Sequence, residues 1–214
     1  MNLFSLDGPI QKYGTILFDM IILSFLWVII SLASLGILMG PATCGLYYSA
    51  HHSIIHQSSS TLKSFFSAFK RKFKYAIIGW LILTVVISVS IVALNMIKED
   101  ILPSILFPVY VTVIIYMSMM APYYIALTTM TKMKFKLLVK YSFFLSIKHL
   151  PTTILLLIIM IVSGMVLYLT NYITILILPA AIGLVASYLI TDKASTQYDF
   201  SLLEPEEDES INTI

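Results

Sequence analysis

The residues in this chain that could bind a metal ion are three histidines close together. His52 and His56 are four residues apart, which on a helix places them on one face at the spacing of metal ligands, and His51 lies beside them. A tetrahedral site needs further ligands, yet no cysteine or carboxylate is close in sequence, and aspartate and glutamate are absent between Asp19 and Glu99. We therefore expect no metal here and interpret the histidines as a polar, solvated helix end.

Motifs for catalysis are absent from the sequence. It contains no G-x-S-x-G or H-E-x-x-H motif, no glycine-rich phosphate loop and no pair of carboxylates within its apolar segments. The single cysteine, Cys44, cannot form an intrachain disulfide and is expected to be a reduced packing residue. A net charge of +2, without a basic stripe outside the apolar segments, does not favour nucleic-acid binding. We expect neither an enzyme nor a cofactor.

One ionisable residue, Asp19, falls inside an apolar segment. Ionisable residues at membrane depth usually mark ion or proton pathways, and a single one disfavours a proton- or sodium-coupled transporter. Asp19 could accept hydrogen bonds from a partner helix or a substrate. The favoured interpretation is a carboxylate at the outer membrane interface, stabilised by the positive end of its helix.

The elements that must position these residues are membrane helices. The chain has 214 residues, of which 59% are hydrophobic and 11% charged, and its mean hydropathy of +0.94 is too high for an ordinary soluble globule. Crossing a hydrocarbon core takes about 20 residues of helix. Five segments are long enough: 15–39, 75–96, 101–130, 152–170 and 172–190. We predict an all-α, polytopic transmembrane helix bundle.

The placement of lysine and arginine predicts the orientation of the bundle. Of the thirteen such residues, ten lie in two short segments that follow the first and third spans. They are Lys63, Lys70, Arg71, Lys72 and Lys74, then Lys132, Lys134, Lys136, Lys140 and Lys148. Basic residues in short loops stay on the cytoplasmic side. We therefore predict a multi-pass protein of the cell membrane with its N-terminus outside and its C-terminus inside.

Both basic segments are predicted to form amphipathic cytoplasmic helices. The first places phenylalanines, Phe65 or Phe66 among them, on one helical face and cations on the other, and the second repeats lysines at four-residue spacing among apolar residues. The favoured role is to pin the loops to anionic headgroups of the inner leaflet, and the alternative is docking of a partner protein. The candidate interfacial or partner-docking residues are Phe65, Phe69, Lys70, Phe73, Lys132, Lys136 and Lys140.

The first span carries a small, partly polar stripe that suits close packing of helices rather than catalysis. Its members are Ser24, Trp27, Ser31 and Ser34. Candidate hinges are Gly40, Pro41 and Pro122, because glycine and proline bend membrane helices. The segment 36–50 either continues the first span as one bent helix or forms a short re-entrant piece.

The order of features repeats along the chain. Each half has a span, a helix break at Gly40–Pro41 or at Ala121–Pro122, an amphipathic helix and a second span. The pattern predicts a parallel repeat of 15–96 and 101–170 with a fifth span at 172–190, all within one transmembrane domain, 1–193. The acidic tail, 194–214, is predicted to be a disordered cytoplasmic segment.

Several of these landmarks appear in the same order in a known family. The segments concerned are FDMIILSFLW (18–27), GPATCGLYY (40–48), FFSAFKRKFK (65–74), MAPYY (120–124) and SIKHLPTT (146–153). In them the chain resembles the YesL-like family, a bacterial family of integral membrane proteins of unknown function, over nearly its whole length except the acidic tail. Two features depart from the family pattern. Ser24 stands where an asparagine is usual, and the arginine usual after the second-half proline has no counterpart.

The resemblance implies a context rather than an activity. Members occur especially in Gram-positive bacteria, encoded beside carbohydrate importers of the ATP-binding-cassette (ABC) type, polysaccharide-degrading enzymes and two-component regulators. This implies an accessory or assembly subunit that contacts the permease subunits of an oligosaccharide importer. The first alternative is a stand-alone transporter or channel for a small neutral or sugar-derived solute, with Trp27, Tyr116, Tyr123 and Tyr124 lining a cavity. The second is a membrane sensor for a carbohydrate-utilisation regulator.

Overall fold

The computed structural model describes residues 9–55, 61–71, 73–98, 103–131, 133–170 and 173–197. Within these ranges every regular element is a helix. In chain order they are α1 (Pro9–Ala33), α2 (Met39–Ile55), α3 (Thr61–Arg71), α4 (Phe73–Lys98), η1 (Ser104–Leu106), α5 (Phe107–Met130), α6 (Phe135–Lys148), α7 (Leu150–Leu169), η2 (Ile173–Leu176) and α8 (Leu178–Gln197). Most of the predicted acidic tail, 198–214, lies outside the described residues.

Four helical stretches in the described part are long and apolar enough to cross a membrane. They are Gly14–Ala33, Phe73–Lys98, Ser104–Met130 and Leu150–Leu169. A helix of 20 residues is about 30 Å long, which matches the hydrocarbon core. The predicted polytopic helical membrane bundle is thus confirmed. The fifth predicted span corresponds to η2 and α8, whose apolar helical part, Leu178–Ile190, is shorter.

The first span ends earlier than predicted. Helix α1 stops at Ala33, and the turn over 34–38 contains Leu35 with φ 50° and Gly36 with φ 84°. Glycine adopts positive φ without steric cost, whereas a continuing helix needs negative φ. The predicted continuation of the span to residue 39 is therefore wrong.

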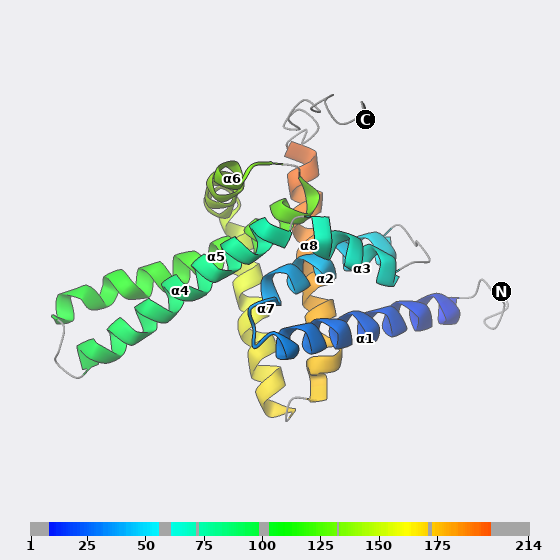
Figure 1. Ribbon diagram of the computed structural model, residues 1–214, viewed down its shortest axis with the longest axis horizontal. Coiled ribbons are helices and arrows are strands. Elements are labelled where there is room, and N and C mark those ends of the chain that lie inside the picture. The colour runs from blue at the N-terminus through cyan, green and yellow to red at the C-terminus, as the bar shows by residue number, and fades with distance from the viewer. Residues whose placement is uncertain are drawn as a thin grey trace, which may run out of the picture.

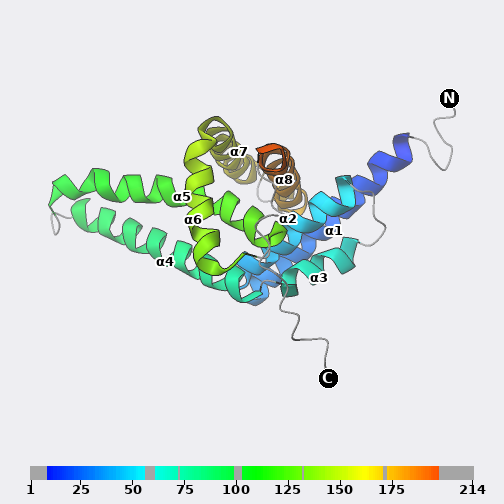
Figure 2. The same cartoon turned by 90° about the horizontal axis from the view of Figure 1, so that it is seen from above.

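Helix α2 folds back along α1. The indole N–H of Trp27 donates to Thr43 Oγ1 at 2.9 Å, and Leu23 shares a buried cluster with Leu46. In the sequence, the midpoint of each pair falls within the turn over 34–38, which is the pattern of an antiparallel hairpin. Helix α2 also packs against α3, α4, α5 and α8, so it forms the centre of the bundle (Figure 2). A single bent helix through 36–50 is excluded.

Helix α3 runs back along α2 and returns the chain to the start of α4. Gly45 of α2 lies against the ring and carbonyl oxygen of Phe65. After α2 and α3, the indole N–H of Trp80 on α4 donates to the Gly36 carbonyl oxygen at 3.1 Å. The turn after α1 and the first turns of α4 are therefore neighbours.

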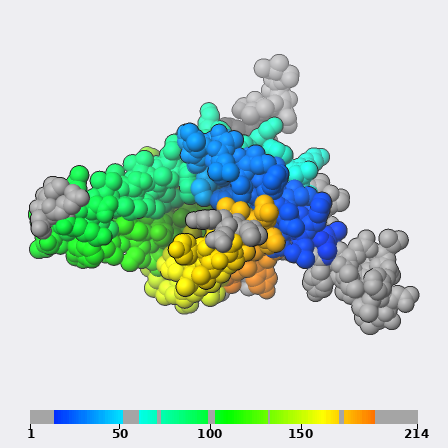
Figure 3. All heavy atoms as spheres, turned by 90° about the horizontal axis from the view of Figure 1, so that it is seen from below, coloured from blue at the N-terminus to red at the C-terminus, as the bar shows by residue number. Residues whose placement is uncertain are grey.

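Helices α4 and α5 form a long hairpin that projects from the rest of the molecule (Figures 1 and 3). We call this hairpin the α4–α5 arm. The face of α4 toward α5 repeats every seven residues, the period of left-handed helix pairing. The buried residues at this spacing are Ala76, Leu83, Ser90 and Ile97.

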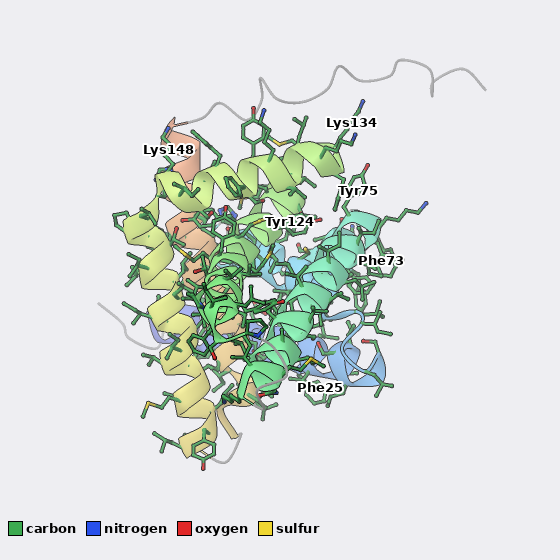
Figure 4. The ribbon with its side chains drawn as sticks, turned by 90° about the vertical axis from the view of Figure 1, so that its left-hand side faces the viewer. Phe25, Phe73, Tyr75, Tyr124, Lys134 and Lys148 are labelled. Atoms are coloured by element: carbon green, nitrogen blue, oxygen red, sulfur yellow. The ribbon has the colours of Figure 1, made fainter. Side chains whose placement is uncertain are left out.

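The remaining helices cover the other side of α5. Helix α6 lies across the end of the bundle, above α7 (Figures 1 and 4), and contacts α5 and α7. Helices α7 and α8 form a second hairpin that runs steeply across the line of α1 (Figure 1). Helix α5 continues through Ala121 and Pro122 to Met130, so the predicted break there is wrong. Transmembrane helices tolerate proline when neighbouring groups satisfy the freed carbonyl.

Candidate functional site

Ser24, the first residue of the predicted packing stripe, joins α1 to α8. Its side chain is fully buried, and its hydroxyl accepts the backbone N–H of Ala180 at 3.1 Å. Ala180 is the third residue of α8, where the N–H groups have no acceptor within the helix. Ser24 therefore caps a helix that lies far away in the sequence, and the structure places it at a helix–helix contact.

The other members of the stripe lie in contacts that do not involve α8. Trp27 bonds to Thr43 of α2, and Thr43 in turn donates to the Met39 carbonyl oxygen at 2.6 Å. Ser34 belongs to the turn after α1, where its hydroxyl accepts the N–H of Leu38 at 3.0 Å. The Ser31 hydroxyl is buried without a hydrogen bond to any described residue. The stripe thus contributes to the α1–α2 hairpin and its turn as well as to α8.

The candidate hinge residues Gly40 and Pro41 begin α2 instead of bending a helix. Pro41 is fully buried in the first turn, where its missing N–H costs nothing. A side chain at Gly40 would meet Trp80 and the Ala76 carbonyl oxygen, so glycine allows α2 and α4 to approach closely. The bend itself lies in the turn over 34–38.

Two of the tyrosines proposed to line a cavity are in contacts between α5, α6 and α7. The hydroxyl of the buried Tyr123 is 2.9 Å from Thr153 Oγ1, and Thr153 Oγ1 donates to the Ser146 carbonyl oxygen at 2.9 Å. The ring of Tyr116 packs against Phe143 with 5.0 Å between centroids. These hydrogen bonds and the ring contact hold the three helices together.

Tyr124 fixes the start of α4 to α5. Its hydroxyl donates to the Tyr75 carbonyl oxygen at 2.6 Å. Its ring occupies the space that a side chain at Gly79 would need, so only glycine permits this approach. The Phe135 ring at the start of α6 lies 6.4 Å from the Tyr124 ring and 6.3 Å from the Tyr75 ring.

The phenylalanine face of α3 meets protein at its centre. Phe65 is fully buried against Gly45 of α2, so its predicted availability to lipid or a partner is wrong. Phe69 stacks on Phe65 at 6.3 Å and contacts Phe73 at 5.3 Å, and both are half-buried. The helical periodicity is as predicted, but the face it defines packs largely inside the bundle. Lys70 is exposed on the opposite side.

Helix α6 keeps a mixed exposed face. Lys136 and Lys140 are exposed beside Phe143 and Ile147, which have 50% and 47% of their surface exposed. Cations interleaved with apolar side chains suit the headgroup level of a bilayer, where lysine stems lie along apolar surface. Lys132 lies outside the described residues.

Helix α4 carries a polar strip on the side that faces away from α5. Thr84, Ser88 and Asn95 are exposed, share one helical face and make no side-chain hydrogen bond with any described residue. They lie within an apolar helix whose other exposed residues include Val85 and Val92, at 57% and 52%. In hydrocarbon, polar side chains on a helix surface favour contact with another helix. The sequence interpretation missed this strip, which only its helical spacing could have indicated.

The interpretation of Asp19 needs correction. Helix α1 begins at Pro9, so Asp19 is nearly three turns inside it. Stabilisation by a helix N-terminus falls off within the first turn. The proposed role of the positive helix end is therefore wrong, and the half-buried Asp19 lies along the body of α1.

No metal centre is formed by the described residues, since they contain no group of three histidine, cysteine, aspartate or glutamate side chains close enough to share an ion. The side chains of His52 and His56 lie outside the described part. The polar and charged side chains described above form helix contacts in the core, a polar strip on α4 and basic surfaces at the ends of helices. They are suited to association with helices and lipids.

Comparison with models of known protein families gives a match to part of the chain. The family described as "Protein of unknown function, DUF624" matches residues 20–94, which run from α1 to near the end of α4. No curated protein and no solved structure matches the chain. The match covers the second half of α1, all of α2 and α3, and the polar strip as far as Ser88.

Proposed function

We propose that this protein is an accessory or assembly subunit that binds other membrane proteins, with the permease subunits of an oligosaccharide importer of the ABC type as its partners. The importer, a Gram-positive source and location in the cell membrane rest on the resemblance to the YesL-like family. The binding role rests on the polar strip of α4.

The position of the strip supports helix association. Helix α4 is 26 residues long, about 39 Å, and Thr84 and Ser88 lie near its middle. Helix α4 contacts α2, α5 and η1, and along the α4–α5 arm it lies beside α5 with its other side open to lipid or to another protein (Figures 1 and 2). A partner helix there would satisfy groups that lipid cannot.

The transporter alternative has less support. It needs polar side chains free to line a path at mid-membrane. The hydroxyls of Tyr123 and Tyr124 and the indole of Trp27 are instead bonded to neighbouring helices. The sensor alternative depends on the acidic tail, most of which lies outside the described residues.

Purification from native membranes in mild detergent tests the proposal. The protein should carry importer permease subunits with it, and the triple variant Thr84→Val, Ser88→Ala, Asn95→Leu should lose them. Hydrogen bonds between membrane helices contribute about 0.6 kcal/mol each on average. Three such bonds give about 2 kcal/mol, which corresponds to about thirtyfold weaker association.

A matched control is Thr112→Val on α5. Thr112 is exposed like the strip residues, but its hydroxyl already donates to the Pro108 carbonyl oxygen at 2.7 Å within its own helix. This variant should retain the partners. Isolation of the parent protein without any importer subunit would overturn the proposal, and equal loss in the control variant would remove the strip as its basis.

A further inference from the structure

The first turns of α4 and α6 are held side by side by an aromatic contact. The rings of Tyr75 and Phe135 are 6.3 Å apart, and both are half-buried. Tyr124 braces them, because its hydroxyl bonds to the Tyr75 carbonyl oxygen and its ring contacts Phe135. We call this junction the α4/α6 corner. Figure 4 shows Tyr75 and Lys134 together on this side of the molecule, with Tyr124 between the helices.

The α4/α6 corner carries positive charge with no acid beside it among the described side chains. Lys74, Lys134 and Lys136 are all exposed and lie next to the aromatic residues in sequence. Asp19 on α1 is the one carboxylate among the described side chains, and α1 has no substantial contact with α6. An anion at the corner therefore meets cations from two helices and no described acid.

The corner also has a place for acyl chains. On α4, Ile78 and Ile82 follow Lys74 at four-residue spacing, and they are 44% and 47% exposed. A row of this kind puts a cation at the end of an apolar span and exposed apolar side chains directly along it. A phospholipid fits this arrangement, with its phosphate at the lysines and its tail along the isoleucines. Free phosphate would use only the lysines.

The corner adjoins the ends of two candidate membrane spans. Helix α4 begins at Phe73 and α5 ends at Met130, so the lysines stand where two spans leave the hydrocarbon core. Aromatic residues such as Tyr75 favour this level. On the side where basic loops are expected, the leaflet presents anionic headgroups that attract lysine.

We propose that the α4/α6 corner is a binding site for an anionic phospholipid of the inner leaflet, with Lys74, Lys134 and Lys136 as the headgroup ligands. The site differs from diffuse attraction of a basic surface because it joins two helices through one lipid. It is independent of the partner proposed for the strip on α4.

Native mass spectrometry of the full-length protein, released from equal mixtures of phosphatidylglycerol and phosphatidylcholine, tests this site. The parent should retain phosphatidylglycerol in preference to phosphatidylcholine. A lysine near an anionic surface contributes a factor of about five. The triple variant Lys74→Gln, Lys134→Gln, Lys136→Gln should therefore lower the preference by tenfold or more. Exposed lysines are not needed for folding, so its melting temperature should match the parent's.

Two controls distinguish the corner from the general surface charge. Lys98→Gln changes an exposed lysine at the other end of α4, and Lys63→Gln removes an exposed cation from α3 that is not among the candidate interfacial residues. Both should retain the preference for phosphatidylglycerol. Equal loss in the α3 variant would show diffuse attraction and overturn the site, as would a parent protein that binds the two lipids alike.

Discussion

Removing the Ser24 hydroxyl should loosen α8 from α1. In Ser24→Ala the N–H of Ala180 loses its acceptor, and it cannot turn to water because both residues are fully buried. Pro179, the preceding residue, has no N–H, so Ala180 is one of few donors in the first turn of α8 that need an acceptor outside the helix. The substitution does not weaken the helical preference of α1, since alanine favours helix more than serine does.

The size of the effect follows from three comparisons. A buried donor left without an acceptor costs about 1–3 kcal/mol, and loss of a helix cap costs about 1 kcal/mol. Hydrogen bonds between membrane helices average about 0.6 kcal/mol and reach about 1.7 kcal/mol. We expect a loss of about 1 kcal/mol for Ser24→Ala. In a chain of this size that corresponds to a melting temperature lower by about 2–4 °C.

The single cysteine provides the assay. Cys44 is 3% exposed at the centre of the bundle, so a fluorogenic thiol reagent should label it only as the protein unfolds in detergent. The control is Ser88→Ala, which removes an exposed hydroxyl that bonds to no described residue and should leave the melting temperature unchanged. The capping role is refuted if the melting temperature of Ser24→Ala equals that of the parent, or if both serine variants lower it equally.

Two further predictions use the same protein. Gly79→Ala should destabilise it by about 1–3 kcal/mol, because the new methyl group would overlap the Tyr124 ring, whereas Gly164→Ala, in open space on α7, should be neutral in the same melting assay. Burial raises the pKa of the Cys44 thiol from 9.0 to about 12, so its contribution to stability is complete below pH 9 and is lost as the pH rises toward 12. At about pH 10.5 the loss is about 2 kcal/mol. Melting followed by tryptophan fluorescence should therefore decline more steeply with pH in the parent than in Cys44→Ala, and parallel declines would contradict this.

The long spans were predictable because hydropathy and helix length determine them. The predicted 75–96 and 152–170 agree closely with Phe73–Lys98 and Leu150–Leu169. The break after Ala33 was not found, because a turn inside a continuous apolar run leaves no trace in hydropathy. Its local signal is Gly36, which adopts positive φ, and the signal for a central α2 is its series of small residues, such as Gly40 and Gly45.

The surfaces show a second limit of sequence patterns. Periodicity predicted that Phe65 and Phe69 share a face, and they do, but it could not say whether that face meets lipid or protein. Phe65 meets protein because it packs against Gly45, which belongs to another helix, α2. Likewise, the buried position of Ser24 depends on α8, more than 150 residues away along the chain.

The unexpected helix α2 is compatible with the predicted position of the first basic segment. Helix α2 runs back along α1, and α3 runs back along α2. The two helices together therefore bring the chain back toward the end of α1. The bond from Trp80 to the Gly36 carbonyl oxygen joins the end of α1 to the beginning of α4. The chain therefore enters α4 from the side on which it left α1, as it would with a simple loop. Basic residues at the start of α4 can then stay cytoplasmic with the N-terminus outside. Helices α2 and α3 add a packed centre to the bundle without adding a membrane crossing.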